Sequence, residues 1–215
     1  EYTVQKDGQI MVRSSVSKGE NVMKAGSDIR KGETILRKGK VLSSHEIGVL
    51  AALGIDRVEV FKRPKVAIIS TGAEVVEPGK PLQPGKIYDI NAHTLSAAVA
   101  ECGGEPLGLG IVQDQTDLME AALKKALSKA DVAITSGGVS VGPTDIIPKV
   151  LNALGKPGVI VYGIAIRPGK PPTIAVVNGK PVFSLPGHPA SALLIFHFFV
   201  RPTLTKMAGK QDETP

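Results

Sequence analysis

The fold is decided by residues 131–142, which read DVAITSGGVSVG. Residues 131–135 have the short, apolar and partly β-branched character of a buried strand. A glycine pair follows and predicts a tight turn, because glycine permits positive φ angles. A helix is then expected to begin near Thr144 and to end at Gly155. A strand, a glycine-rich loop and a helix in this order are typical of an α/β protein with a parallel sheet.

Strands and helices alternate in the same way from residue 65 onward. The apolar periodicity predicts strands at 65–70, 106–112 and 159–166, and helices at 92–101 and 117–129. Asn91 is the expected N-cap of the first of these helices, and Asp117 with Glu120 has capping-box spacing at the start of the second. We therefore predict a three-layer α/β domain, a mostly parallel sheet with helices on both faces.

The last part of this domain follows a different pattern. Two apolar runs flank Asn178 and Gly179, and this dipeptide is the strongest short-range signal for a two-residue hairpin turn. A final helix is predicted from about Pro189, with a bend at Pro202 because proline cannot donate the helical hydrogen bond. A hairpin and a helix are therefore expected to close the domain.

Residues 1–62 differ from the rest in having many Lys and Gly residues and only short apolar stretches. A hairpin is predicted at 33–42 and a strand at 57–61. Between them a short helix is expected, started by the capping-box spacing of Ser43 and Glu46 and stopped by a glycine. These elements predict a small N-terminal α+β domain.

We place the domain boundary at Arg63-Pro64, which gives a small N-terminal segment at 1–62 and the α/β domain at 63–215. The chain starts at Glu1 in mid-pattern and without an initiator methionine. It is therefore expected to be a fragment whose first domain is incomplete.

Composition limits the classes of function. The chain has 215 residues, and its 42% hydrophobic and 21% charged residues are typical of a globular protein. The net charge of +6 favours an anionic partner, which could be nucleic acid, a membrane surface or a phosphorylated small molecule. No helix-turn-helix, zinc-finger or RNA-reading motif occurs, and Trp is absent, so we expect no nucleic-acid partner.

The single cysteine, Cys102, excludes an intrachain disulfide and a multi-cysteine zinc site. A reducing compartment is therefore expected. The longest apolar run, near 192–200, is about half of the roughly 20 residues that span a bilayer. We expect a soluble, cytoplasmic protein with no membrane partner.

The unusual segments of the chain all follow predicted strands or the predicted hairpin. They lie at 70–74, 113–114, 136–142, 167–170 and 186–189. In an open α/β sheet, ligands bind in the crevice outside the carboxyl ends of the strands. We therefore expect these five segments to line one site.

Two of these segments suit an anion. The loop at 136–142 supplies groups that allow close backbone approach or donate hydrogen bonds, namely Gly137, Gly138, Gly142, Ser136 and Ser140. Taken alone, a glycine pair after a strand is more often only a tight turn. Arg167 and Lys170 could hold an oxyanion, or they could belong to a solvated turn.

Three carboxylates, Glu74, Asp114 and Asp145, stand at three separate strand ends. Hard oxygen ligands of this kind suit Mg²⁺, which binds through one or two carboxylates and substrate phosphates. Each acid alone is more simply a helix cap or an exposed charge, and this alternative is strongest for Asp145. Their joint placement predicts a metal site.

Five motifs occur in a characteristic order. They are Ser-Thr-Gly-x-Glu at 70–74, Tyr-Asp-x-Asn at 88–91, Ser-Gly-Gly-Val-Ser-Val-Gly at 136–142, Arg-Pro-Gly-Lys-Pro at 167–171 and Leu-Pro-Gly-x-Pro-x-Ser at 185–191. As a set they resemble the molybdopterin molybdenumtransferase family, the MoeA type that includes the gephyrin E domain. Residues 19–61 are similar to the segment that precedes this family's pterin-binding domain, so the resemblance covers nearly the whole chain.

The resemblance implies a molybdopterin-binding α/β domain in a transferase. Such an enzyme takes adenylylated molybdopterin and molybdate, inserts the metal, and releases AMP with the help of Mg²⁺. Glu74, Asp114 and Asp145 match the family's essential acids, with catalytic and metal-binding roles. The resemblance also implies a homodimer and a molybdopterin adenylyltransferase as a possible partner.

Other positions match those that bind the substrates in the family. They are Thr71, Gly72, Ser136, Gly137, Gly138, Ser140, Gly142, Arg167, Lys170, Pro186, Gly187, Pro189 and Ser191. Some positions depart from the family pattern, which could alter metal affinity or pterin fit. The departures are Ala73, Pro143, Thr144 and His188.

Two other functions stay open at this point. A related single-domain pterin adenylyltransferase shares the same core, although the N-terminal segment of this chain argues against it. A binding or scaffold module could keep the pterin fold without turnover, and Ala73 and the missing family domains keep that alternative open.

Overall fold

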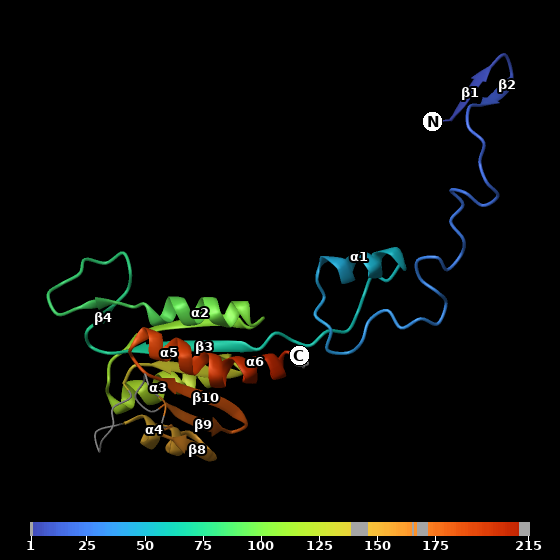
Figure 1. The fold of residues 1–215 in the computed structure, drawn as a ribbon. Coiled ribbons are helices and arrows are strands. Elements are labelled where there is room, and N and C mark those ends of the chain that lie inside the picture. Colours follow the sequence, from blue (N-terminus) through green and yellow to red (C-terminus); the bar gives the residue numbers. More distant parts are fainter. Residues whose placement is uncertain (1, 139–145, 165, 167–171, 211–215) are drawn as a thin grey trace. The chain divides into compact units, whose positions relative to one another are not determined.

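The structure is a computed structural model that describes residues 2–138, 146–164, 166 and 172–210. The chain divides into two compact units, Glu1–Lys38 and Gly39–Pro215. Figure 1 shows the course of the chain through its helices and strands. Among the described residues, no helix is long and apolar enough to cross a membrane. The domain boundary placed at Arg63-Pro64 stays a prediction.

The first unit contains one hairpin. Strand β1 (Thr3–Lys6) pairs antiparallel with β2 (Gln9–Val12) across Asp7 and Gly8, whose φ angles are 52° and 76°. Asp-Gly is a standard two-residue hairpin signal, although no hairpin was predicted here. The hairpin predicted at 33–42 is wrong, because its Lys-Gly-Lys centre is not a two-residue hairpin turn and no strand forms there.

Helix α1 (Ser44–Ala52) begins as predicted. Ser43 is its N-cap, and the side chains of Ser43 and Glu46 form the expected capping box with the backbone. These hydrogen bonds, with that from the Ser43 side chain the largest cause, lower the pKa of Glu46 from 4.5 to about 2. The strand predicted at 57–61 is wrong, since this segment has no partner strand and follows an irregular path.

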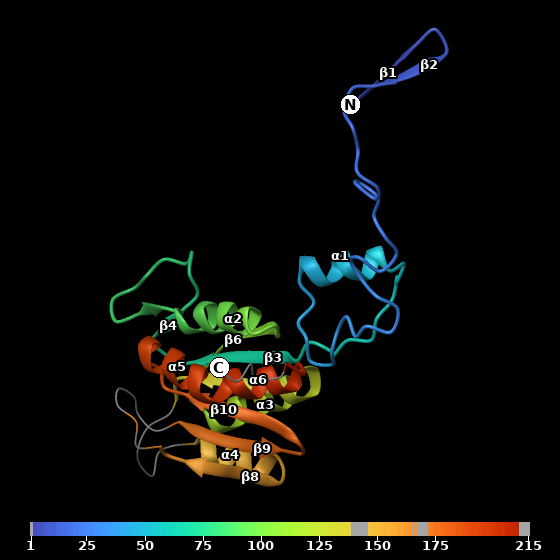
Figure 2. The ribbon, with the colours of Figure 1, turned by 45° about the vertical axis from the view of Figure 1, so that its right-hand side comes forward.

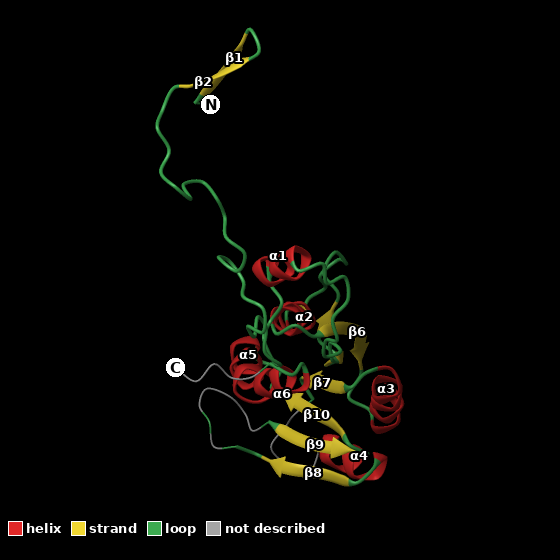
Figure 3. Ribbon diagram, turned by 90° about the vertical axis from the view of Figure 1, so that its right-hand side faces the viewer, coloured by secondary structure: helices red, strands yellow, loops and turns green. Residues whose placement is uncertain are grey.

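The second unit is built on a six-stranded sheet (Figure 3). In spatial order its strands are β6 (Glu105–Val112), β3 (Lys65–Thr71), β7 (Val132–Ser136), β10 (Lys180–Leu185), β9 (Thr173–Val177) and β8 (Pro157–Tyr162). The first four are parallel to one another, and β9 is antiparallel to both of its neighbours. The predicted mostly parallel sheet is confirmed, although β8 ends four residues earlier than predicted, just before Gly163 with its positive φ.

Helices cover both faces of this sheet, as predicted (Figures 2 and 3). One face carries α2 (Asn91–Glu101), α5 (Pro189–Ile195), the π-helical turn η1 (Phe196–Val200) and α6 (Arg201–Met207). The other face carries α3 (Thr116–Lys129) and α4 (Ile147–Leu154).

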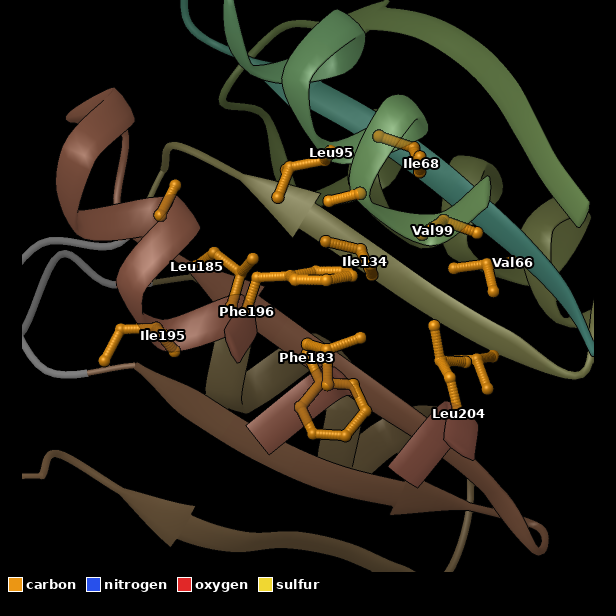
Figure 4. Close-up of a cluster of buried hydrophobic side chains, with 14 residues drawn as sticks. Val66, Ile68, Leu95, Val99, Ile134, Phe183, Leu185, Ile195, Phe196 and Leu204 are labelled. Atoms are coloured by element: carbon orange, nitrogen blue, oxygen red, sulfur yellow. The ribbon is translucent and has the colours of Figure 1, made fainter. Parts of the chain in front are cut away.

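Alternating side chains of β3 build the two apolar cores. Val66 and Ile68 face α2 and the last helices, whereas Ala67 and Ile69 face α3 and α4, because successive side chains of a strand point to opposite faces. Figure 4 shows the first core, in which Phe196 is fully buried. Burial on both faces fixes the register of β3, since a shift by one residue would exchange the two cores.

Two predicted helix caps are wrong. The N-cap of α2 is Ile90, and the side chain of Asp89 accepts the backbone N–H of Ala92 at 2.9 Å. Asp89 therefore satisfies the helix start in place of Asn91. Helix α3 begins after Gln115 without a side-chain cap, and Asp117 lies inside its first turn, where a negative charge favours the helix dipole.

The turn and helices predicted for the C-terminal part of the chain agree better with the structure. The Asn178-Gly179 turn joins β9 to β10, with φ angles of 50° and 82°. Helix α4 ends before Gly155 as expected, whereas its predicted start near Thr144 lies outside the described residues. The final helix starts at Pro189 as predicted, and its α-helical course is interrupted by η1, directly before the turn that contains Pro202.

Candidate functional site

Three strand ends meet at the glycine pair after β7. A Cβ atom added at Gly137 would lie 2.5 Å from the carbonyl oxygen of Thr71, the last residue of β3. A Cβ atom at Gly138 would lie 2.8 Å from Thr71 Oγ1 and 2.9 Å from Asp114 Oδ1. The φ angles of the two glycines are 94° and 65°. Only glycine fits here, so the backbone after β7 lies close against the ends of β3 and β6.

The acid of the first motif lies at the same end of the sheet. A Cβ atom at Gly72 would lie 2.7 Å from Glu74 Oε2, so this carboxylate folds back over Gly72. The N–H of Gly72 donates to Val112 O at 3.4 Å, which joins the turn to the end of β6. Glu74 and Asp114 are both exposed. The two acids therefore stand at neighbouring strand ends, open to a ligand.

The loop after β10 packs against the loop after β7. The Gly137 N–H donates to Leu185 O at 3.1 Å, and the Ser136 hydroxyl donates to Pro186 O at 3.4 Å. Gly187 approaches so closely that its added Cβ would lie 3.5 Å from the Gly137 Cα. The two loops thus form one packed unit.

Two further predicted residues lie in the helix that follows the β10 loop. Pro189 is the first residue of α5, and Ser191 is buried in its first turn. Proline suits this first position because its missing N–H has no helical partner there.

Asn91 belongs to this site, although its side chain was predicted only to cap a helix. Its side-chain Nδ2 donates to Ser136 Oγ at 2.6 Å and to Gly187 O at 2.8 Å. The Tyr-Asp-x-Asn motif at 88–91 was the signal that could have identified it. Its two partners are 45 and 96 residues away in the sequence, so no local pattern reveals these bonds.

A short parallel ladder connects Glu74 to the start of α2. Strand β4 (Val75–Val76) pairs with β5 (Ile87–Tyr88), and the segment between them forms a loop (Figure 2). The Ile87 N–H donates to Glu74 O at 2.9 Å, and Lys86 Nζ donates to Ala73 O at 2.6 Å. Hydrogen bonds from Lys86 and Ile87 therefore hold the backbone at Ala73 and Glu74.

Unpartnered polar groups gather at this end of the sheet. Among the described residues, six buried side-chain atoms lack a hydrogen-bond partner, on Ser70, Thr71, Asn91, Thr135, Thr173 and Ser184. Five of these residues lie at the carboxyl ends of the parallel strands or pair with such a residue, and Asn91 contacts the end of β7. Native proteins leave few buried polar groups unpaired, so this end is suited to a polar ligand or ordered solvent.

Several predicted site residues lie outside the described part of the chain. They are Ser140, Gly142, Asp145, Arg167 and Lys170, together with the departing positions Pro143 and Thr144. Within the part that is described, no three acidic, histidine or cysteine side chains gather as a metal-binding group. The three-acid metal site therefore stays a prediction.

Sequence comparison assigns the family. Residues 67–206 match the family described as "Probable molybdopterin binding domain". The chain belongs to this molybdopterin-binding family. Residues 1–54 match the "MoeA N-terminal region (domain I and II)". The resemblance carried by the five motifs is thereby confirmed.

Individual relatives agree with this assignment. The chain is 38% identical to molybdopterin molybdenumtransferases from Nostoc sp. and from Haemophilus influenzae, which match 97% and 99% of its length. A solved structure of a molybdopterin biosynthesis MoeA protein from Pyrococcus horikosii is 42% identical over 97% of the chain, with a TM-score of 0.81. The chain spans 48%, 52% and 52% of these three proteins, or about half the length of each.

The matched part of the molybdopterin-binding family contains every strand end that forms the site. Its span of 67–206 includes the loops after β3, β6, β7 and β10 and the start of α2. The candidate site therefore lies within the matched residues.

Proposed function

We propose that the protein carrying this chain is a molybdopterin molybdenumtransferase of molybdenum cofactor biosynthesis. It would insert molybdenum from molybdate into adenylylated molybdopterin and release AMP, in the cytoplasm. The likeness to relatives of that name over nearly the whole chain supports this activity. The observation that carries it is the close approach of Gly138 to both Thr71 Oγ1 and Asp114 Oδ1, which brings backbone, hydroxyl and carboxylate groups to one point.

The glycine-rich loop would bind the phosphate and pterin. The Gly137 N–H is already donated to Leu185 O, so we assign the anion donors to Gly138 and to the residues after it, including Ser140 and Gly142. Thr71 and Gly72 would form the adjoining wall. Pro186, Gly187, Pro189 and Ser191 would shape the opposite wall, because the β10 loop packs on Gly137.

Arg167 and Lys170 would hold molybdate. Arginine binds an oxyanion through two parallel N–H donors, whereas lysine supplies a compact positive charge. Both follow β8 in the sequence. The carboxyl end of β8 lies at the same end of the sheet as the carboxyl ends of β7 and β10. They would orient molybdate toward the molybdopterin.

Glu74, Asp114 and Asp145 would hold Mg²⁺. The two described acids fit this role, because they are exposed oxygen ligands in the segments that follow β3 and β6, two hydrogen-bonded neighbouring strands. Bound Mg²⁺ would neutralise charge on the phosphoric anhydride. The chain itself would position the substrates and would not supply a covalent nucleophile. Cys102 does not suit the role of a nucleophile, because burial raises the pKa of its thiol. It also follows the C-terminal end of α2, whereas Asn91 is at the N-terminal end.

The test uses the full-length protein that carries this chain, with adenylylated molybdopterin, molybdate and Mg²⁺. AMP release coupled to metal insertion is expected, and Asp114→Asn should slow it about 10- to 100-fold. Asp117→Asn is the matched control, since Asp117 is a nearby exposed acid in the first turn of α3, and it should leave the rate unchanged.

Other outcomes would overturn the proposal. ATP-dependent adenylylation of molybdopterin without molybdate would identify an adenylyltransferase, and tight molybdopterin binding without turnover would identify a binding module. Sedimentation of the same protein, alone and with a molybdopterin adenylyltransferase, would test the proposed homodimer and the proposed partner.

A further inference from the structure

Asn91 joins the two loops that line the candidate site. It is the first residue of α2 and is only 7% exposed. Its amide donates to Ser136 Oγ, at the end of β7, and to Gly187 O, after β10. We infer that Asn91 is a positioning residue, which holds the described start of the glycine-rich loop, Ser136–Gly138, against the β10 loop in the geometry that binds the phosphate and pterin. This inference rests on the proposed function.

The start of α2 leaves the Asn91 side chain available for this role. Asp89, two residues earlier, accepts the Ala92 N–H at 2.9 Å and so satisfies a free donor of the first helical turn. Asn91 therefore has no capping task. Within the Asp-x-Asn part of the motif, the Asp89 carboxylate caps the helix, and the Asn91 amide is hydrogen-bonded to the two loops.

The hydrogen-bond partners fix the orientation of the amide. Gly187 O can only accept, so the Asn91 atom 2.8 Å away must be the NH₂ group. The second N–H of that group points to Ser136 Oγ, which accepts it and donates its own proton to Pro186 O. Both donors of Asn91 and the proton of Ser136 are therefore engaged between the loops.

The same arrangement assigns Ser136 an indirect role. Its hydroxyl links Asn91 to the Pro186 carbonyl, and its buried side chain is only 2% exposed. It therefore acts on the ligand through the loop geometry. A direct hydrogen bond from this hydroxyl to the ligand would require Pro186 O to lose its partner.

The residues just before Asn91 are hydrogen-bonded to the segment that carries the acid of the first motif. The Asp89 N–H donates to Val76 O at 2.8 Å, and the Ile87 N–H donates to Glu74 O at 2.9 Å. The turn that carries Glu74 is thus continuous, through a short ladder, with the first residues of α2. A shift of Asn91 would therefore displace the acid and both loops. Misplacement of a catalytic group by about 1 Å can lower the rate about 100-fold.

Common replacements cannot reproduce these bonds. Alanine removes both donors. Aspartate has the same size but places an acceptor opposite Gly187 O. We expect Asn91→Ala and Asn91→Asp to weaken molybdopterin binding about ten-fold or more and to lower kcat for AMP release, with Ser96→Ala as the control. Ser96 is in the same helix, and its hydroxyl donates to Ala92 O within that helix.

Hydrogen exchange tests the positioning directly and needs no ligand. In both Asn91 variants the Gly137 amide should exchange at least about ten-fold faster, while core amides such as Ile68 and Ile134 keep their protection. An equal loss of protection throughout the sheet would mean that Asn91 only stabilises the fold. Unchanged exchange at Gly137 would also refute the inference.

A double-mutant cycle separates this inference from the proposed function. The loss of molybdopterin affinity caused by Ser136→Ala should be smaller in the Asn91→Ala background than in the wild type, because the two residues act through one network. Independent, multiplicative losses would refute the positioning role. If the wild-type protein binds no molybdopterin, the proposed function fails, whereas binding that is insensitive to Asn91 refutes only the inference.

Discussion

The two ends of the central sheet differ in how their polar groups are satisfied. At the amino ends of the strands, Asp131 accepts the Lys65 N–H at 2.8 Å, and Lys180 Nζ donates to Ala130 O at 3.0 Å and to Leu127 O. None of the six unpartnered buried atoms of the described residues lies at this end of the sheet, because Thr173, the first residue of the antiparallel strand β9, pairs with Ser184 near the carboxyl end of β10. At the carboxyl ends, unpartnered hydroxyls and close glycine contacts gather instead.

Because of this difference, the amino end of the sheet contributes mainly to stability, and the carboxyl end contributes mainly to ligand binding. An unsatisfied buried polar group costs about 1–3 kcal/mol, so the carboxyl end is less stable than it could be. The same groups remain available to a ligand. Substitutions at the amino end should therefore lower stability without affecting binding, and those at the carboxyl end should affect binding first.

The largest effect is expected for Gly137→Ala. Its Cβ would lie 2.5 Å from the backbone oxygen of Thr71, and φ is 94°, so both the β7 loop and the end of β3 must move. We expect AMP release to fall at least about 100-fold, and the free energy of unfolding to fall by about 3 kcal/mol. Steady-state kinetics and urea denaturation measure the two quantities.

Gly179→Ala is the matched control for this variant. Gly179 has a similar φ of 82°, but its added Cβ meets no atom within 4 Å, and it adjoins the amino end of β10. We expect a loss of about 1–2 kcal/mol from backbone strain alone, with an unchanged rate. Equal losses of activity in both variants would contradict the comparison between the two ends.

A smaller effect is expected at the amino end for Lys180→Met. The Lys180 ammonium group binds two carbonyl oxygens at the C-terminus of α3, where a positive charge also favours the helix dipole. Its loss should lower the free energy of unfolding by about 1–3 kcal/mol and leave molybdopterin affinity unchanged. Lys125→Met, an exposed position on α3, should change neither quantity. A weakened affinity in Lys180→Met would show that the two ends are coupled.

Ser184→Ala tests the carboxyl end in the opposite direction. Ser184 is fully buried, and its hydroxyl has no hydrogen-bond partner among the residues that the structure describes. Its removal should therefore raise the free energy of unfolding by about 1 kcal/mol. Chemical denaturation without ligand measures this change. A loss of stability would mean that the hydroxyl is already satisfied, and would weaken the distinction between the two ends.

The smallest effect is expected for Glu46, whose side chain is hydrogen-bonded in the capping box of α1, outside the sheet. Its pKa is lowered from 4.5 to about 2, so the charged form is favoured in the folded state. The stabilisation of α1 is then complete above pH 4.5 and is lost as the pH falls toward 2. An NMR titration should give a Glu46 midpoint near 2. Glu46→Gln should abolish the loss of amide protection, measured relative to intrinsic exchange, that acidification from pH 4.5 to 2 causes in the first turn of α1. A midpoint near 4.5 would contradict this.

Local signals in the sequence predicted the fold well. The Asn178-Gly179 turn and the Ser43 capping box depend only on neighbouring residues, and both were correct. The N-cap of α2 was wrong because Asp89 and Asn91 are both good caps, and the choice between them depends on a distant loop that uses the amide of Asn91.

The candidate site could be predicted only in part. Parallel strands place their carboxyl ends together, so the convergence of Thr71, Asp114 and Gly138 follows from the strand order. The side-chain network around Asn91 depends on contacts across 45 and 96 residues, which periodicity cannot reveal. Which substrate or ion each residue binds depends on the chemistry of its side chain, and the fold alone does not specify this.

The loop between β4 and β5 contains Pro78, Pro81 and Pro84, which restrict the backbone before folding begins. A chain with fewer accessible conformations in the unfolded state loses less entropy when the loop closes. The stiffness of this solvent-exposed segment thereby adds to the hydrogen bonds that hold the backbone of the acid at position 74. Loosening that segment with glycines should make the acid mobile while the sheet beneath it keeps its stability.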